Sequence, residues 1–165
     1  MGPREVGAGR VVPLFFYETL GVNACVRKLR GWKMRDTPSL MSEFGAALQF
    51  FDDFGENWYA LEECLCYLDE WLPADAYVLV VERSEEILSR DDDGLRALMT
   101  TINAAGSFWS KPVIDGPEQY RRPARPFHVL MLLGEGQLQS SERLLRAAEA
   151  VGVRVLEGHS NGLES

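Results

Sequence analysis

The stretch FDDFGENWYALEECLCYLDEWLPAD, residues 51–75, contains eight acidic residues and no lysine or arginine. Its first part, DDFGEN, predicts a loop with Gly55 as its flexible point and Asn57 as the N-cap of a following helix. We expect that helix at about 58–70, ended by Pro73. At 100° per residue its apolar side holds Trp58, Leu61, Leu65, Leu68 and Leu72, and its polar side holds Tyr59, Glu62, Glu63, Cys66 and Glu70.

The elements around this stretch alternate between strands and helices. Residues 36–51 predict a helix capped by Thr37, with Pro38 at its first position. Its apolar stripe is Leu40, Phe44, Ala47, Leu48 and Phe51. Residues 24–34 predict an edge strand, and its basic residues are expected on a solvated surface.

Two apolar runs predict buried strands. YVLVVE, residues 77–82, is typical of a central strand covered on both faces, and FHVLMLL, residues 127–133, predicts a second buried strand. His128 in that second run is expected to be a hydrogen-bonded wall residue. Between the runs we expect a helix at 95–105 and a proline-rich surface connection at 106–126, whose RRPARP segment reads as a basic loop or as a ligand for a partner domain.

This order of elements predicts an α/β fold with a parallel sheet. We divide the chain into an N-terminal arm at 1–23, a domain at 24–134 and a C-terminal extension at 135–165. The N-terminal segment 1–23 contains a short apolar run at 11–16, interrupted by Pro13 and suited to an edge strand or extended segment. The extension is expected to hold a helix, a short strand at 153–156 and a frayed end.

Negative charge is concentrated in one segment of the chain. The net charge is −8, and residues 36–82 contain eleven acids and no base. Such a segment attracts cationic partners and repels nucleic acid phosphate, and a solvated acidic surface is the plainer interpretation. We therefore expect no nucleic acid partner.

Composition excludes several classes of protein. No apolar run is long enough for a transmembrane helix, and the first ten residues lack the apolar core of a signal peptide. The three cysteines are too few and too irregular for a disulfide framework, and with two histidines they predict no zinc site. We expect a cytoplasmic protein with no membrane partner, no metal and no cofactor.

A binding surface explains the acidic stretch better than a catalytic site does. Glu62 and Glu63 diverge by about 100° on a helix, so they share one proton poorly. The sequence contains no phosphate loop, GxGxxG or Ser–His–Asp signature. An exposed surface that mixes tyrosines with carboxylates offers pairs for arginine and rings for stacking.

The segment FGENWYALEECL, residues 54–65, resembles the signature of the barstar family, small intracellular inhibitors of secreted guanyl-specific ribonucleases. The likeness extends through LRGWKMR, FGAALQFFDDFGENW, WLPADAYVLVV and RPARPFHVLML, from about Ala24 to Leu133. The resemblance implies a three-stranded parallel sheet packed with helices. It also implies that the loop and second helix block the active site of a nuclease, with Glu63 in the place of a substrate phosphate.

The partner-binding residues implied by the resemblance and the helical pattern are Phe54, Gly55, Glu56, Asn57, Tyr59, Glu62, Glu63, Cys66 and Tyr67. Asn57 could equally serve only as the helix cap. Three positions depart from the family pattern. Tyr59 stands where an acid is usual, Glu63 replaces the frequent aspartate, and Asn103 stands near a further expected acid on the third helix.

The leading hypothesis is an inhibitor of antitoxin or immunity type that binds a basic ribonuclease or another cationic protein. The alternatives are a non-inhibitory interaction domain of the same fold and an enzyme that uses Glu62, Glu63 or His128. The helical wheel predicts that Cys66 faces solvent and is open to alkylation in the folded state, and burial of Cys66 would contradict the assignment of the binding face.

Overall fold

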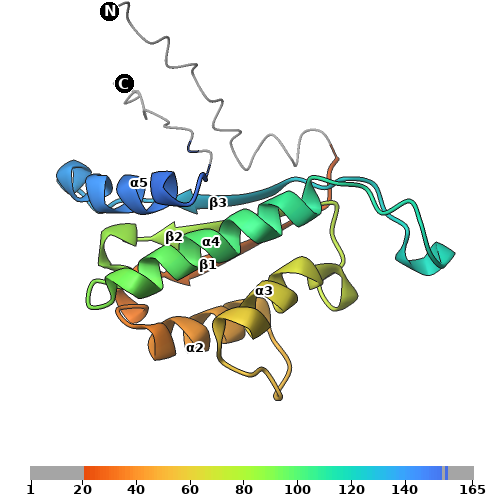
Figure 1. The fold of residues 1–165 in the computed structure, drawn as a ribbon, viewed down its shortest axis with the longest axis horizontal. Helices are drawn as coiled ribbons and strands as arrows, with labels where there is room; N and C mark the ends of the chain where they lie inside the picture. Colours follow the sequence, from red (N-terminus) through yellow and green to blue (C-terminus); the bar gives the residue numbers. More distant parts are fainter. Residues whose placement is uncertain (1–20, 154, 156–165) are drawn as a thin grey trace, which may run out of the picture.

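The computed structural model describes residues 21–153 and Val155 and contains one three-stranded parallel sheet (Figure 1). Its strands are β1 (Ala24–Arg30), β2 (Ala76–Glu82) and β3 (Phe127–Met131), in the spatial order β1-β2-β3. The register runs from Ala24↔Ala76 to Arg30↔Glu82 in the first pair and from Tyr77↔Phe127 to Val81↔Met131 in the second. The predicted α/β fold with a three-stranded parallel sheet is confirmed.

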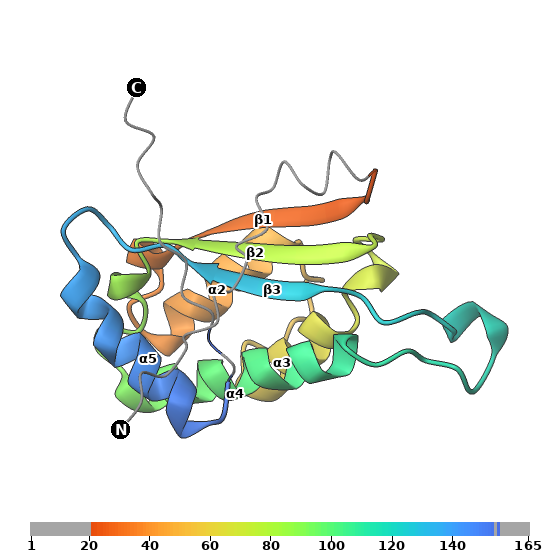
Figure 2. The ribbon, with the colours of Figure 1, turned by 90° about the horizontal axis from the view of Figure 1, so that it is seen from above.

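The helices are α2 (Thr37–Leu48), α3 (Trp58–Cys66), α4 (Asp92–Trp109) and α5 (Ser141–Ala150). Strand order follows chain order, so right-handed crossovers place the connecting helices on the same face of the sheet. Figure 2 shows α3 and α4 together on one side of the three strands. No helix in the described part of the chain is long and apolar enough to span a membrane.

Strand β2 is the centre of the core. Every residue from Ala76 to Val81 is buried, as the apolar run predicts for a strand with neighbours on both edges. Strand β3 differs from the prediction, because it lies at the edge of the sheet and is only partly buried. His128 is exposed on this edge, so its predicted role as a wall residue is wrong.

Helix α2 begins one residue earlier than predicted. Asp36, not Thr37, is the N-cap, and its carboxylate accepts the backbone N–H of Ser39 at 3.0 Å. The Thr37 hydroxyl instead donates to the Asp91 carboxylate at 2.7 Å, at the start of α4. The hydroxyl is therefore engaged by a residue that is distant in the sequence, and Asp36 is left to cap α2.

Helix α4 is longer than predicted and runs to Trp109, since Gly106 does not interrupt it. A long connection, residues 110–126, then leads to β3 and projects beyond the end of the sheet (Figure 1). Helix α5 packs against α4, where Leu144 and Ala148 join the hydrophobic core. The predicted strands at 11–16 and 153–156 lie wholly or partly outside the described residues.

Candidate partner-binding site

The loop between α2 and α3 has a defined shape at its end. The Asn57 carboxamide oxygen accepts the N–H of Ala60 at 3.0 Å, which confirms the predicted N-cap, and its amide group donates to the Gly55 carbonyl at 3.0 Å. The left-handed residue is Glu56, with φ of 45°, and not the glycine. A non-glycine residue in this region carries strain of roughly 1 kcal/mol, so the surrounding contacts hold the loop in place.

The close packing of the loop requires a residue without a side chain at Gly55. A Cβ atom on Gly55 would lie 3.0 Å from the Asn57 amide nitrogen and 3.5 Å from the Ala60 Cβ. The absent side chain therefore lets the loop close over the start of α3. Gly55 is a packing position in this loop and does not itself have a left-handed backbone, so the prediction that it is the flexible point is wrong.

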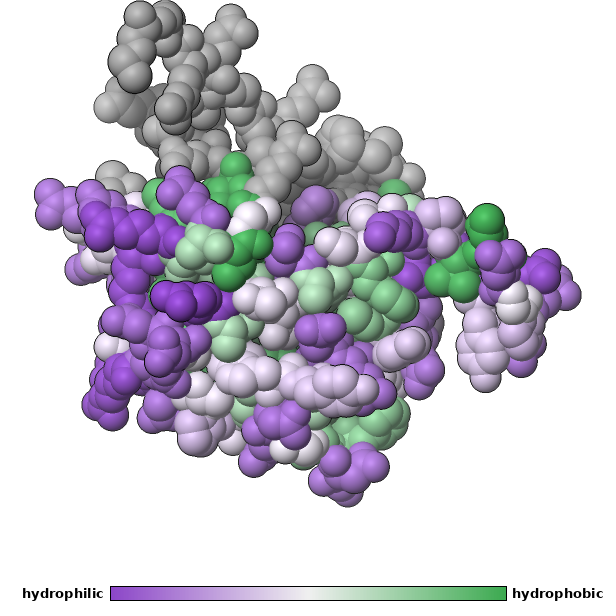
Figure 3. Space-filling view, viewed as in Figure 1, coloured by the Kyte–Doolittle hydropathy of each residue, from purple (hydrophilic) through white to green (hydrophobic). Residues whose placement is uncertain are grey.

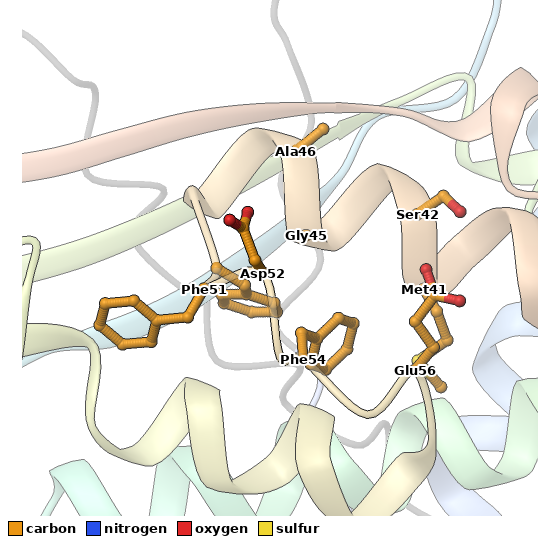
Figure 4. Close-up of a pocket in the computed structure, with 9 residues that line it drawn as sticks. Met41, Ser42, Gly45, Ala46, Phe51, Asp52, Phe54 and Glu56 are labelled. Atoms are coloured by element: carbon orange, nitrogen blue, oxygen red, sulfur yellow. The ribbon is translucent and has the colours of Figure 1, made fainter.

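Most of the predicted face is open to solvent. Exposed positions are Gly55, Glu56, Asn57, Tyr59, Glu62, Glu63 and Tyr67, and Tyr59 retains 79% of its accessible surface. Phe54 is half-buried, with its ring 3.6 Å from the position of a Cβ on Gly45 of α2. In Figure 4 the Phe54 ring lies between the loop and α2, whereas the Phe51 ring points away from Phe54.

Two hollows lie on either side of this loop. The first, of about 260 Å³, lies between the loop and α2 and is lined by residues that include Phe54 and Glu56 (Figure 4). The second, of about 390 Å³, lies between the loop and α3. It brings together four predicted residues, Phe54, Gly55, Glu63 and Tyr67. Neither hollow is lined by Asn57, Tyr59 or Glu62.

Six residues that line the second hollow are not among the predicted partner-binding residues: Phe51, Asp53, Ala60, Cys64, Glu70 and Trp71. Of these, the sequence pattern places only Glu70 on the polar side of the helix. Phe51 was predicted to belong to the apolar stripe of α2, but that helix ends at Leu48 and leaves the ring 57% exposed. Phe51 packs edge-on against Trp71, with ring centroids 5.1 Å apart. The Trp71 indole N–H donates to the Leu48 carbonyl at 2.9 Å, which fixes the wall of the hollow.

The acids of this face are not neutralised by the fold. Glu56, Glu62, Glu63 and Glu70 are exposed, and none forms a salt bridge with another described residue. Asp69 is different, because Arg125 pairs with it at 2.9 Å. The exposed acids therefore present a negative surface that a cationic group can approach without displacing an internal partner.

Cys66 does not belong to the exposed face, and its predicted solvent exposure is wrong. It is 9% exposed, at the end of α3, where that helix packs against α4. Burial, with a smaller contribution from Glu62, raises the pKa of its thiol to about 11. Arg122, from the connection after α4, opposes this shift. The helical pattern identified only one buried side of α3. Helix α4 covers α3 from a second direction, and this contact buries Cys66.

Cys64 is a half-buried member of the second hollow. Burial raises the pKa of its thiol, and the neighbouring charges of Glu63 and Asp53 act in the same direction. The thiol is therefore protonated at neutral pH. It contributes a small apolar surface next to the carboxylates.

The residues of the enzyme hypothesis do not meet in one hollow. Glu63 lines the second hollow, whereas Glu62 lies on the side of α3 toward Cys66. His128 is on the exposed edge of the sheet. Asn103, near which the family pattern places a further acid, is a half-buried residue of α4.

A family model described as "Barstar (barnase inhibitor)" matches residues 24–131. This chain belongs to the barstar family. The match begins with β1 and ends with β3, and it includes the loop, α3 and both hollows. No curated protein and no solved structure matches the chain significantly. The barstar description places the chain, in general terms, among inhibitor proteins, and α5 lies beyond the matched region.

Proposed function

We propose that this protein is an intracellular inhibitor, of antitoxin or immunity type, that binds a basic ribonuclease and blocks its active site. The blocking surface is the loop before α3 together with the exposed side of that helix. The observation that carries the proposal is Glu63, an exposed and unpaired acid on the wall of the second hollow.

The surroundings of Glu63 support this role. Phe54 and Tyr67 contribute rings to the same hollow, and Glu70 contributes a second carboxylate. A carboxylate accepts two parallel hydrogen bonds from a guanidinium group, and rings provide planes on which that group can stack. The site therefore suits the arginines and lysines that a ribonuclease uses to hold phosphate.

The remaining predicted residues have different parts in this proposal. Glu56 and Glu62 extend the negative surface, and Tyr59 offers an exposed ring beside it. Asn57 shapes the loop, because both ends of its amide are already engaged. Cys66 is removed from the contact surface by its burial.

The test is inhibition of a purified guanyl-specific ribonuclease at low and high salt. We expect stoichiometric inhibition, with faster association at low salt because screening of the exposed acids is weaker. Glu63→Gln should weaken the affinity at least tenfold, about 1.4 kcal/mol, because charge-assisted hydrogen bonds are lost. Glu149→Gln removes an exposed acid of α5 and serves as the control for net charge.

Two results would contradict the proposal. One is the absence of binding by the folded protein. The other is equal affinity of Glu63→Gln and Glu149→Gln, since it would place the contact elsewhere.

The second candidate function is a non-inhibitory interaction domain that uses the same face. Tyr59 favours it, because a ring that is 79% exposed stands where the family pattern has an acid. Such a domain would bind its partner while the ribonuclease stays active. Binding and inhibition must therefore be measured in the same samples.

A further inference from the structure

Residues 110–126 form a defined hairpin and not a loose connection. We call this hairpin the arm, as distinct from the N-terminal segment 1–23. Val113 and Arg122 pair as an antiparallel bridge, with backbone hydrogen bonds of 2.9 and 3.0 Å in the two directions. A short 3-10 helix, η4 (Glu118–Tyr120), lies at the turn, and the Arg121 side chain donates to the Gly116 carbonyl at 3.1 Å. Figures 1 and 2 both show the arm projecting beyond the end of the sheet.

Arg122 fixes the root of the arm to the body of the protein. Its side chain is 9% exposed and donates to the carbonyls of Lys111, Pro123 and Phe108 at 3.1 to 3.3 Å. Its guanidinium lies 4.3 Å above the ring of Trp109. A planar group with fixed donors holds such a junction more rigidly than a lysine could. The segment was predicted to be a basic loop, but its Arg122 is an internal structural residue and not an exposed charge.

The projecting part of the arm exposes large apolar side chains. Ile114 is 71% exposed and Tyr120 is 63% exposed. Figure 3 shows strongly hydrophobic surface on the projecting arm. A rigid segment that presents apolar side chains loses little conformational entropy on binding, so it is suited to contact another protein.

The root of the arm is packed against the candidate partner-binding site. Tyr67, which lines the second hollow, contacts the Phe108 ring at a centroid distance of 5.6 Å, and Arg122 covers that ring. Asp69 and Arg125 join the two segments by a salt bridge. The acidic face and the arm therefore form one continuous structure at the end of α3.

We propose that the tip of the arm, Ile114 and Tyr120, is a second contact for the partner that binds the acidic face. It would dock on an apolar patch beside the partner's basic site. The arm also contains Arg122 and Arg125, but Arg122 is buried at its root and Arg125 pairs with Asp69. In the projecting part, Lys111 and Arg121 balance Asp115 and Glu118. Its contribution to affinity should therefore depend little on salt, unlike that of Glu63. The inference rests on the proposed function.

The experiment measures binding kinetics of a guanyl-specific ribonuclease to the full chain at two salt concentrations. The double substitution of Ile114→Ser and Tyr120→Ser should raise the dissociation rate at least tenfold and leave the salt dependence of association unchanged. Glu63→Gln should reduce that salt dependence. Leu132→Ser, an exposed apolar residue at the opposite end of β3, is the control and should bind as the wild type.

Circular dichroism and the midpoint of urea unfolding establish that each variant is folded. If the midpoint of the double variant falls, Ile114→Ser and Tyr120→Ser are measured separately in its place. Wild-type dissociation rates in the arm variants, with weakened binding by Glu63→Gln, would overturn the arm contact and leave the proposed function intact. Failure of the wild type to bind would overturn both. Loss of self-association in the arm variants, with unchanged ribonuclease binding, would make the arm an interface between copies of this chain.

Discussion

Cys66 lies where α3 tightens into the short helix η2 (Leu68–Glu70). The Tyr67 N–H donates to both the Glu63 and the Cys64 carbonyls, so the chain leaves α-helical geometry at this point. The thiol is enclosed, whereas Glu63, only three residues earlier, is exposed. Residues three apart on one turn thus belong to the core and to the proposed binding surface.

We predict that Cys66 resists alkylation in the folded protein. Its pKa is raised to about 11. At pH 8 only about one thiol in a thousand is therefore the reactive thiolate. In a variant with Cys25→Ser and Cys64→Ser, iodoacetamide should modify Cys66 only after denaturant is added, as measured by intact mass. Rapid modification of the native variant would show that the end of α3 is open.

Cys64 provides the comparison for that experiment. It lines the second hollow and is only half-buried, so a variant with Cys25→Ser and Cys66→Ser should react faster than the first variant. Equal alkylation rates for Cys64 and Cys66 would contradict the assignment of Cys64 to the open hollow and of Cys66 to the core.

The loop and α3 act as one unit because Asn57 joins them. Its carboxamide links the Gly55 carbonyl on one side to the Ala60 N–H on the other. The strained backbone at Glu56 lies between these two links. The acids of the proposed binding surface therefore take their positions from a local hydrogen-bond pattern.

We predict that Asn57→Ala lowers the free energy of unfolding by about 1 kcal/mol, because an N-cap is lost. Asn57→Asp should lose less stability than Asn57→Ala, because aspartate caps equally well, although its carboxylate cannot donate to the Gly55 carbonyl. Urea unfolding measures both changes. Partner affinity of the same variants separates the cap from a direct contact. If the Asn57 amide contacts the partner, Asn57→Asp weakens partner binding more than its loss of stability explains.

The arm is the second segment that acts as a unit. Arg122 and Arg125 hold its root, so the two exposed side chains at its tip are presented from a fixed base. This rigidity is the reason that the arm substitutions above are expected to act on dissociation.

In the molecule as a whole, two groups of acids among the described residues differ in their consequences. Glu43 of α2 is buried and accepts hydrogen bonds from the Arg30 side chain at 2.8 Å, which ties β1 to α2. Asp36 and Asp91 cap helices. The exposed acids of the binding face lack such partners, so the first group supports folding and the second is free for a partner.

We predict that stability falls with decreasing pH in a way that depends on Glu43. The hydrogen bonds from Arg30 hold the pKa of Glu43 below its usual value, and those from Ser39 and Thr37 do the same for the pKa values of Asp36 and Asp91. A depressed folded-state pKa means that the unfolded chain binds protons first. This stabilisation is therefore complete above the unfolded value for Glu, about 4.3, and is lost as pH falls through the folded value.

Urea unfolding from pH 7 to pH 3 measures this dependence. Glu43→Gln should reduce the free energy of unfolding at pH 7 by about 1–3 kcal/mol and flatten its decline toward pH 3. Parallel pH profiles for the two proteins would show that another carboxylate is responsible.

Local sequence patterns were sufficient for several features. The apolar run at 77–82 predicts a central strand, and the pairing of β2 on both sides confirms it. Asn57 before a helical repeat predicts a cap, because capping involves residues only three apart. The family signature at 54–65 lies within the matched region. Each of these features depends on propensity, periodicity or short-range hydrogen bonds.

Features that depend on distant neighbours could not be predicted in this way. Thr37 bonds to Asp91, 54 residues away, and Asp69 pairs with Arg125, 56 residues away. Cys66 is buried because a second helix covers α3, and Phe51 is exposed because α2 ends at Leu48. A periodic pattern identifies one apolar side of an element, but the second covering surface and the site at which a helix stops depend on side chains that only folding brings together.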